Sequence, residues 1–260
     1  MVSLRAPVYV LLLALSALVL AGCGNGASSA TTNDPDDLVV DTQEEGGPDW
    51  AKGKADPAPG EALTGFVEAG IEKDYRAMWD SLSTATQARI APDYESFAKD
   101  VARDFATSVG AFVREDVGVV NSFRTSNRIA VASVAGDRVD PATKKKEFET
   151  FGAALVKQRR EWKLELFGPI VLTLVIPEER IALSKPRVAV SAEAGAPIIE
   201  VGVWMDGKQY ASPTEGASPT QMTIFAEAED EFTPGDHTVM AYASVGDTAV
   251  ATAWTFIIAD

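Results

Sequence analysis

The first apolar run of the chain, residues 8–21, follows a single positive charge at Arg5. The run is about 14 residues long, which is short of the roughly 20 that a membrane-spanning helix needs. A charged start, an apolar middle and small residues at the exit are typical of a secretory signal. The pattern therefore predicts export of the chain rather than a permanent transmembrane anchor.

The exit of this signal reads Leu20-Ala21-Gly22-Cys23, and Cys23 is the chain's only cysteine. The four residues resemble the lipobox of bacterial lipoproteins, position by position. In that family the Cys thiol receives diacylglycerol, and a peptidase then cuts before it. The resemblance implies that residues 1–22 are a signal peptide and that Cys23 is the lipidated start of the mature protein. The alternative is an ordinary secretory signal with an incidental Cys.

Lipidation at Cys23 would hold the protein at the extracytoplasmic face of the cell membrane. Each methylene buried in the bilayer contributes about 0.8 kcal/mol, and two acyl chains, palmitate among them, give stable attachment where one is marginal. Residues 23–58 are mostly small, polar, acidic or proline, and such a segment buries too little surface to fold. We expect a disordered acidic tether that spans roughly 30–35 Å.

Helical spacing begins after the tether. Apolar residues recur at helical intervals over residues 63–71, 75–82 and 94–105, which predicts three amphipathic helices. Asp74 and Asp93 precede the second and third helices and are expected N-caps.

The pattern then changes to that of β-strands. Four stretches rich in β-branched and aromatic residues follow, at residues 111–120, 128–135, 148–158 and 162–174. Helices followed by an antiparallel sheet predict an α+β fold for residues 59–176.

The segment from Phe66 to Trp79, with the later strand Trp162-Lys163-Leu164, resembles nuclear transport factor 2-like domains. The resemblance covers residues 59–176 and implies a cone, with three helices closing over a curved antiparallel sheet. Some enzymes of this fold, steroid isomerases among them, hold an Asp base and Tyr or Asp donors in a pocket under the helices. Similar domains occur in bacterial lipoproteins and ahead of the transpeptidase of some penicillin-binding proteins.

Residues 177–186 are bounded by prolines and are expected to form a linker. Beyond it, residues 187–260 show only strand and turn patterns. Strands are expected at residues 188–193, 198–205, 221–227, 237–245 and 248–258. Asp206-Gly207 suits a hairpin turn. Residues 232–243 and Trp254-Thr255-Phe256 resemble bacterial immunoglobulin-like domains, which implies a small all-β sandwich.

The formal net charge of −15 limits the choice of partners. Phosphate backbones and anionic membrane surfaces both require clustered Lys and Arg. We therefore expect no nucleic-acid partner, and we expect contact with the membrane only through the lipid on Cys23.

The chain's only histidine, His237, is a poor candidate for catalysis. Asp236 is adjacent, but neighbours on a strand point to opposite faces. One His and no free thiol also make a zinc site unfavourable. Ser96 and Lys99 match the Ser-x-x-Lys of penicillin-recognising enzymes, but the other elements of that family are missing.

Two further groups of polar residues have structural interpretations that we favour. The cone segment contains Asp80, Asp93, Tyr75 and Tyr94, of which the tyrosines fall on apolar stripes and Asp93 at a helix start. The acidic residues Glu227, Glu229, Asp230 and Glu231 lack the spacing of a calcium loop. They are expected to form a solvated edge.

The sequence therefore predicts no catalytic residue, no metal site and no cofactor, and it leaves the ligand-binding residues unassigned. We expect a non-enzymatic lipoprotein with a binding or scaffolding role in the cell envelope. One alternative is a ligand-binding or catalytic cone with a pocket under its helices. A second is an accessory protein of cell-wall synthesis, with an envelope or cell-wall protein as its partner.

Overall fold

The computed structural model describes residues 57–140, 143–177, 180–211 and 220–259, which belong to one compact unit. The expected signal peptide, Cys23 and the tether up to residue 56 lie outside the described residues. None of the helices in the described ranges has the length and apolar character needed to cross a membrane. The fold class is α+β, as the order of sequence patterns predicts.

The helices come first, and short polar caps set their boundaries. They are α2 (Pro57–Glu72), α3 (Tyr75–Ser81), α4 (Thr84–Ile90), α5 (Tyr94–Ser96), the π-helical turn η3 (Phe97–Val101) and α6 (Ala102–Val109). The side chains of Asp74 and Asp93 accept the backbone N–H of the third residue beyond them, at 3.0 and 2.8 Å. Both predicted N-caps are confirmed. The sequence interpretation missed α4, which Ser83 caps in the same way.

Three open sheets follow in the described part of the chain. Sheet 1 has the order β1-β2-β3-β4 and is antiparallel, with β1 at Gly118–Arg124, β2 at Ile129–Val139, β3 at Lys146–Gln158 and β4 at Glu161–Glu165. Sheet 2 has the order β10-β7-β5, with β5 at Ile170–Ile176, β7 at Arg187–Ala194 and β10 at Gln221–Glu227. Sheet 3 has the order β6-β12-β11-β8-β9, with β6 at Ile181–Ala182, β8 at Glu200–Met205, β9 at Lys208–Ala211, β11 at Gly235–Val245 and β12 at Thr248–Ile258.

Two expected strands are wrong in part. The 3-10 turn η4 (Arg114–Asp116) occupies the middle of the stretch expected as a strand at 111–120, and β1 begins only at Gly118. The stretch at 162–174 is two strands: β4 stays in sheet 1, and β5 pairs with β7 in sheet 2. Pro169 lies at the break, where its missing N–H cannot continue a ladder.

The segment expected as a linker, residues 177–186, contains β6, which pairs with β12 in parallel. Strands from both sides of this segment share sheet 2, and the segment itself contributes β6 to sheet 3.

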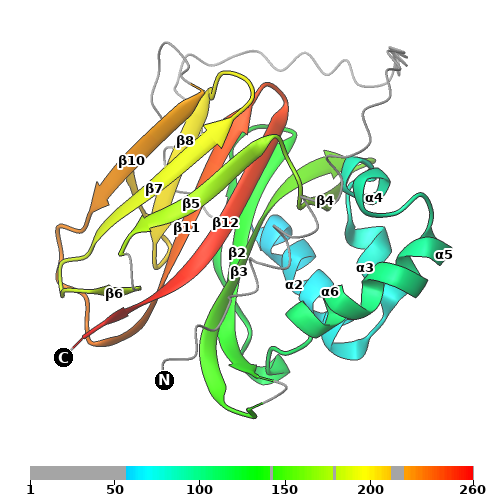
Figure 1. Ribbon diagram of the computed structural model, residues 1–260, viewed down its shortest axis with the longest axis horizontal. Coiled ribbons are helices and arrows are strands. Elements are labelled where there is room, and N and C mark those ends of the chain that lie inside the picture. The colour runs from blue at the N-terminus through cyan, green and yellow to red at the C-terminus, as the bar shows by residue number, and fades with distance from the viewer. Residues whose placement is uncertain (1–56, 141–142, 178–179, 212–219, 260) are drawn as a thin grey trace. The chain divides into compact units, whose positions relative to one another are not determined.

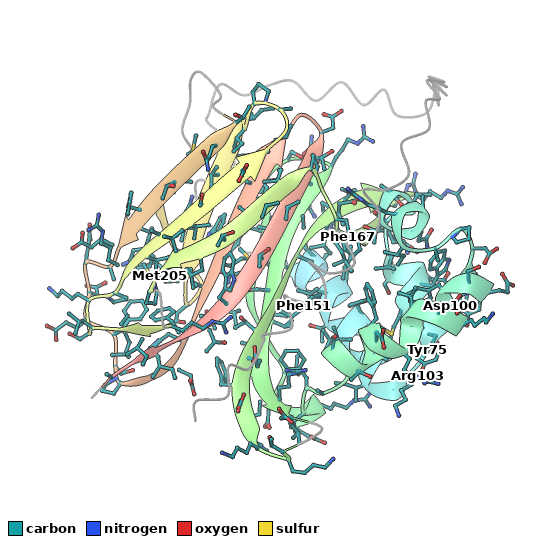
Figure 2. All side chains as sticks on the ribbon, viewed as in Figure 1. Tyr75, Asp100, Arg103, Phe151, Phe167 and Met205 are labelled. Carbon is teal, nitrogen blue, oxygen red and sulfur yellow. The ribbon has the colours of Figure 1, made fainter. Side chains whose placement is uncertain are left out.

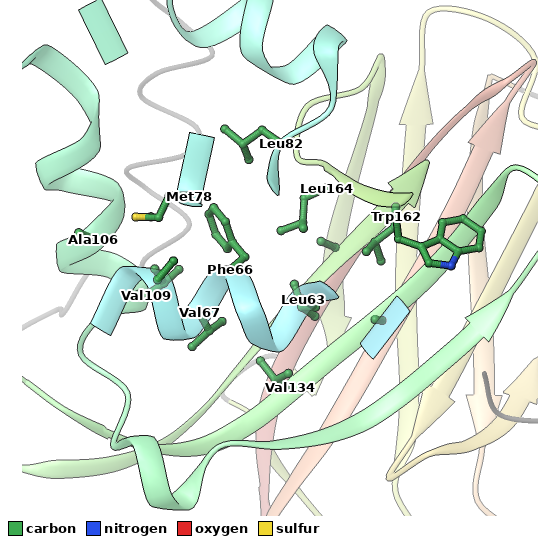
Figure 3. Packing of buried hydrophobic residues seen from close by; sticks show 14 of the residues in the cluster. Leu63, Phe66, Val67, Met78, Leu82, Ala106, Val109, Val134, Trp162 and Leu164 are labelled. Carbon is green, nitrogen blue, oxygen red and sulfur yellow. The ribbon is translucent and has the colours of Figure 1, made fainter. Parts of the chain in front are cut away.

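The helices cover one face of sheet 1 (Figure 1). Alternation along β2 and β3 sends Ala132, Val134 and Leu155 to this face, where they share one cluster with Phe66 and Met78 of the helices. Figure 3 shows Val134, Phe66 and Met78 in this cluster. These side chains are almost completely removed from solvent.

The opposite face of sheet 1 packs against sheet 3 through small side chains. Ala154 of β3 meets Ala251 and Ala253 of β12, with Val131 and Met240 in the same cluster. Sheet 3 is covered on its other face by sheet 2, through a cluster that includes Ile170, Ala192, Val201 and Val250. The layer order is therefore helices, sheet 1, sheet 3 and sheet 2, and the two middle sheets are buried on both faces (Figure 1).

Candidate functional site

Side chains fill the space between the helices and sheet 1, where an enzyme of the cone type would hold its substrate. Phe66, Phe97 and Leu164 are fully buried there. Phe97 lies 5.0 Å from Trp79, and Phe66 stacks on Phe151 at 6.1 Å, measured between ring centroids. The interior between the helices and sheet 1 is therefore occupied by side chains of the hydrophobic core.

The polar residues of the cone segment do not converge on a common point. Asp80 is exposed and forms an ion pair with Arg76 at 3.0 Å. The guanidinium of Arg76 also lies 4.8 Å from the centre of the Tyr94 ring. Asp93 is an N-cap, and hydrogen bonds from the backbone and side chain of Ser96 lower the pKa of its carboxyl. These contacts are structural.

Ser96 and Lys99 are not arranged as a catalytic pair. The backbone N–H of Ser96 donates to Asp93, and Lys99 is exposed on η3. Within the ranges that the structure describes, no hydrogen bond joins the two side chains.

His237 is buried, and both of its ring nitrogens have partners. Nδ1 lies 2.6 Å from Oδ2 of Asp206, and Nε2 lies 2.6 Å from the carbonyl oxygen of Thr233. Asp206 is the first residue of the predicted Asp-Gly turn, but the sequence interpretation did not connect it with His237. A ring engaged on both sides presents no nitrogen to a substrate, so this pair is better suited to holding strands together.

The acidic residues after β10 are exposed, and Asp230 pairs with Lys208 at 3.1 Å. The described residues contain no group of three or more potential ligands that could hold a metal ion.

A buried carboxylate that sequence reasoning missed lies at the end of β4. Glu165 accepts hydrogen bonds from the hydroxyls of Ser83 at 2.5 Å and Thr86 at 3.1 Å. Both hydroxyl-bearing residues are fully buried. The cluster fastens the start of α4 to sheet 1, because Thr86 also accepts the backbone N–H of Leu166.

A second partly buried carboxyl belongs to Glu200 on β8. The hydroxyl of Tyr242 donates to it at 2.7 Å. Burial raises the pKa of Glu200, and the bond from Tyr242 partly offsets this. Burial, with the neighbouring Glu200 charge, raises the pKa of Tyr242 strongly. This pair lies on strands of sheet 3, away from the helices.

An open depression of about 590 Å³ lies at the ends of α2 and α6. We call it the basic depression. Its lining consists of Lys73, Tyr75, Arg103, Ala106, Thr107, Gly110, Ala111, Phe112, Val113, Val139 and Lys144. Three of these side chains are cationic and none is acidic. Figure 2 shows Tyr75 and Arg103 close together on the helical side.

Each cation comes from a different element. Lys73 follows the end of α2, Arg103 lies on α6, and Lys144 lies in the connection between β2 and β3. In the described part of the chain, none of the three side chains has a hydrogen bond or ion pair. They are far apart in sequence, so only the fold brings them together.

Close packing of two glycines brings the ends of α2 and α6 together. A Cβ on Gly110 would lie 2.5 Å from the carbonyl oxygen of Gly70. A Cβ on Gly70 would lie 2.2 Å from a methyl group of Val109. A larger residue at either position would push the helix ends apart, and with them Lys73 and Arg103.

Lys73 occupies the position after a helix where glycine is usual. The N–H of Asp74 bonds to the carbonyl of Ala69 and that of Lys73 to Gly70, which is a Schellman motif. Lys73 consequently has φ of +59°, and Lys144 also has φ of +59°. This left-handed conformation favours glycine over residues with a side chain.

No family model matches the chain, and no curated protein matches it. Among solved structures, the chain is similar to a lytic polysaccharide monooxygenase of Jonesia denitrificans, determined by neutron crystallography. The match has 20% sequence identity and a TM-score of 0.22, and it covers 30% of this chain and 54% of that one. Similarity at this level assigns neither a family nor an activity.

Proposed function

We propose that this protein is a bacterial lipoprotein, held at the extracytoplasmic face of the cell membrane through Cys23, whose folded body binds a ligand without transforming it. The lipobox-like exit of the signal supports the anchor. The observation that carries the binding role is the contrast between a filled interior and an open, basic depression on the surface.

A finer description of the fold belongs to the same proposal. The helices over sheet 1 correspond to a nuclear transport factor 2-like cone, and the facing sheets 2 and 3 correspond to an immunoglobulin-like sandwich. The element order and the shared core of sheets 2 and 3 support this interpretation. Both folds serve recognition in many proteins, although fold alone does not define function.

The anchor is tested by replacing the lipidated atom. With Cys23→Ala, the protein should leave the membrane fraction or keep its signal peptide, because no thiol remains to be acylated. The measurement is fractionation, together with the intact mass of the purified chain. Ser28→Ala, a similar change beyond the lipobox, is the matched control. Detergent-requiring attachment of a Cys23→Ala chain whose mass shows that the signal peptide has been removed would overturn the anchor.

A further inference from the structure

We propose that the basic depression binds a ligand carrying two or more phosphate groups. The inference deepens the binding role and rests on it, but it does not depend on the lipid anchor. The net charge of the chain argues against nucleic acid and anionic membrane surfaces as partners, and it does not by itself indicate a small phosphate-bearing ligand.

The charge of the lining carries the proposal. The chain has 38 acidic and 23 basic residues, yet the depression is lined by three cations and no carboxylate. The neighbouring carboxylates are not part of the lining: Glu72 pairs with Arg114, Asp74 accepts the N–H of Ala77, and Asp140 accepts that of Thr143. Asp100 precedes Arg103 on the same helical segment, but no ion pair joins them in the described ranges. The charged side chains of the lining are therefore all cationic, on a protein that is acidic as a whole.

The arrangement of the cations favours phosphate. Lys73, Arg103 and Lys144 approach the depression from three separate elements. A phosphate group accepts hydrogen bonds in several directions, whereas a carboxylate accepts them in one plane. A single exposed ion pair contributes little, so useful affinity requires a ligand that engages several cations at once.

The rest of the lining suits such a ligand. Tyr75 and Thr107 add polar side chains to the lining, and Phe112, Val113 and Val139 add apolar ones. A few convergent polar groups on a partly apolar surface are typical of small-ligand sites.

The backbone offers a separate way to test the assignment. Two of the three cations, Lys73 and Lys144, have the left-handed conformation that glycine adopts at lower cost. Replacing either one by Gly removes the charge and relieves the backbone. Binding and stability should therefore change in opposite directions, which a purely structural role for these lysines would not produce.

The test is calorimetric titration of the full chain, purified in a non-ionic detergent, with sodium tripolyphosphate at low, fixed ionic strength. We expect saturable binding that Lys73→Gly, Arg103→Gln and Lys144→Gly each weaken at least threefold. The thermal midpoint of the two Gly variants should be equal to or above that of the parent. Lys145→Gln and Lys99→Gln remove exposed charges outside the lining and should change the affinity less than 1.5-fold.

Three further ligands define the chemistry. Citrate carries its charge on carboxylates and matches pyrophosphate in net charge near neutral pH, and we expect it to bind at least fivefold more weakly than pyrophosphate. A glycerol-phosphate trimer presents phosphodiesters. Tighter binding of the trimer than of tripolyphosphate would assign a polymeric source of phosphate, and the reverse would assign a free polyphosphate or nucleotide.

The proposal is overturned by any of three results. These are absence of tripolyphosphate binding, equal weakening by the two control substitutions, and equal affinity for citrate and pyrophosphate. Arg103→Gln lies on an exposed helical surface and leaves the backbone unaltered, so the test holds even if one of the turn variants fails to fold. A failed titration beside a successful Cys23→Ala fractionation would remove the ligand and leave the anchor intact.

Discussion

Asp206 and His237 are joined across β8 and β11 by a hydrogen bond of 2.6 Å. The same carboxylate accepts the backbone N–H of Thr238 at 2.8 Å and its hydroxyl at 3.1 Å. The other ring nitrogen of His237 faces the carbonyl of Thr233, which ties the loop before β11 to the β8–β9 turn. One aspartate at a hairpin turn thus organises three neighbouring backbone segments.

Replacing this carboxylate should destabilise the protein. Asp206→Asn preserves the shape and tolerates the residue's φ of +45°, but it removes the charge that His237 faces. We expect a loss of about 1–3 kcal/mol in the free energy of unfolding, measured by urea denaturation. Asp236→Asn, the same change at an exposed neighbour of His237, should alter it by less than about 0.5 kcal/mol. Equal losses in both variants would contradict the role given to Asp206.

The contact between sheets 1 and 3 predicts a strict size limit at Gly152. A Cβ there would lie 2.9 Å from the Cβ and from the backbone N of Ala253. Gly152→Ala should therefore lower the free energy of unfolding by about 1–3 kcal/mol, as overpacking does, in a urea titration.

Gly118 provides the matched control, because it also lies in a strand of sheet 1 and a Cβ there would meet nothing within 4 Å. Gly118→Ala should be neutral or stabilise by up to about 1 kcal/mol. If Gly152→Ala behaved in the same way, sheets 1 and 3 could not pack as closely as the structure has them.

The local sequence pattern predicts the helices and strands of this fold better than it predicts which strands pair with one another. Residues 221–227 and 248–258 were expected as strands and form β10 and β12 with the same bounds. Asp74 and Asp93 begin helices as their side-chain chemistry predicts. Signals of this kind depend on neighbours within a few residues.

The assignment of strands to sheets depends on information that periodicity does not carry. Pro169 marked a break inside the stretch at 162–174, but β-propensity on both sides masked it. The small residues on both faces of β2, β3 and β12 indicate sheets buried on two sides, which a search for apolar alternation overlooks.

The candidate site was even less accessible to sequence reasoning. Its three cations are 30 and 41 positions apart, at 73, 103 and 144, and share no motif. Helix-end packing at Gly70 and Gly110 brings Lys73 and Arg103 together, and the connection between β2 and β3 adds Lys144. The net charge of the whole chain does not reveal a depression whose charged lining residues are all cationic.

Glu200 predicts a pH dependence with a definite sign. Burial raises the pKa of its carboxyl above the ordinary value of 4.5, so the folded chain favours the protonated form. Its contribution to stability is therefore fully present below pH 4.5 and is lost as the pH rises through the higher pKa of the folded state. Glu200→Gln should match or exceed the parent in stability at pH 7 and lose this advantage at pH 4.

The measurement is the difference in urea midpoint between parent and variant at the two pH values. Other carboxylates affect both proteins equally and cancel in this difference. Glu193→Gln, an exposed glutamate on β7, is the matched control. The prediction would be contradicted if Glu200→Gln were less stable than the parent at pH 7 and this loss were larger at pH 7 than at pH 4.

The cluster around Glu165 predicts the largest loss from removing a single oxygen atom. The hydroxyl of Ser83 both caps α4, by accepting the N–H of Thr86, and donates to the buried carboxylate of Glu165. Ser83→Ala removes the cap and leaves the carboxylate one donor short, which together should lower the free energy of unfolding by about 2–4 kcal/mol.

Ser81→Ala is the matched control, since its hydroxyl only bonds back to the carbonyl of Ala77 within α3 and its loss should be nearly neutral. Urea denaturation followed by tryptophan fluorescence gives both values. Because Glu165 holds α4 against β4, a small effect at Ser83 would mean that packing of Leu82 and Leu164, rather than this polar cluster, fixes the helix to the sheet.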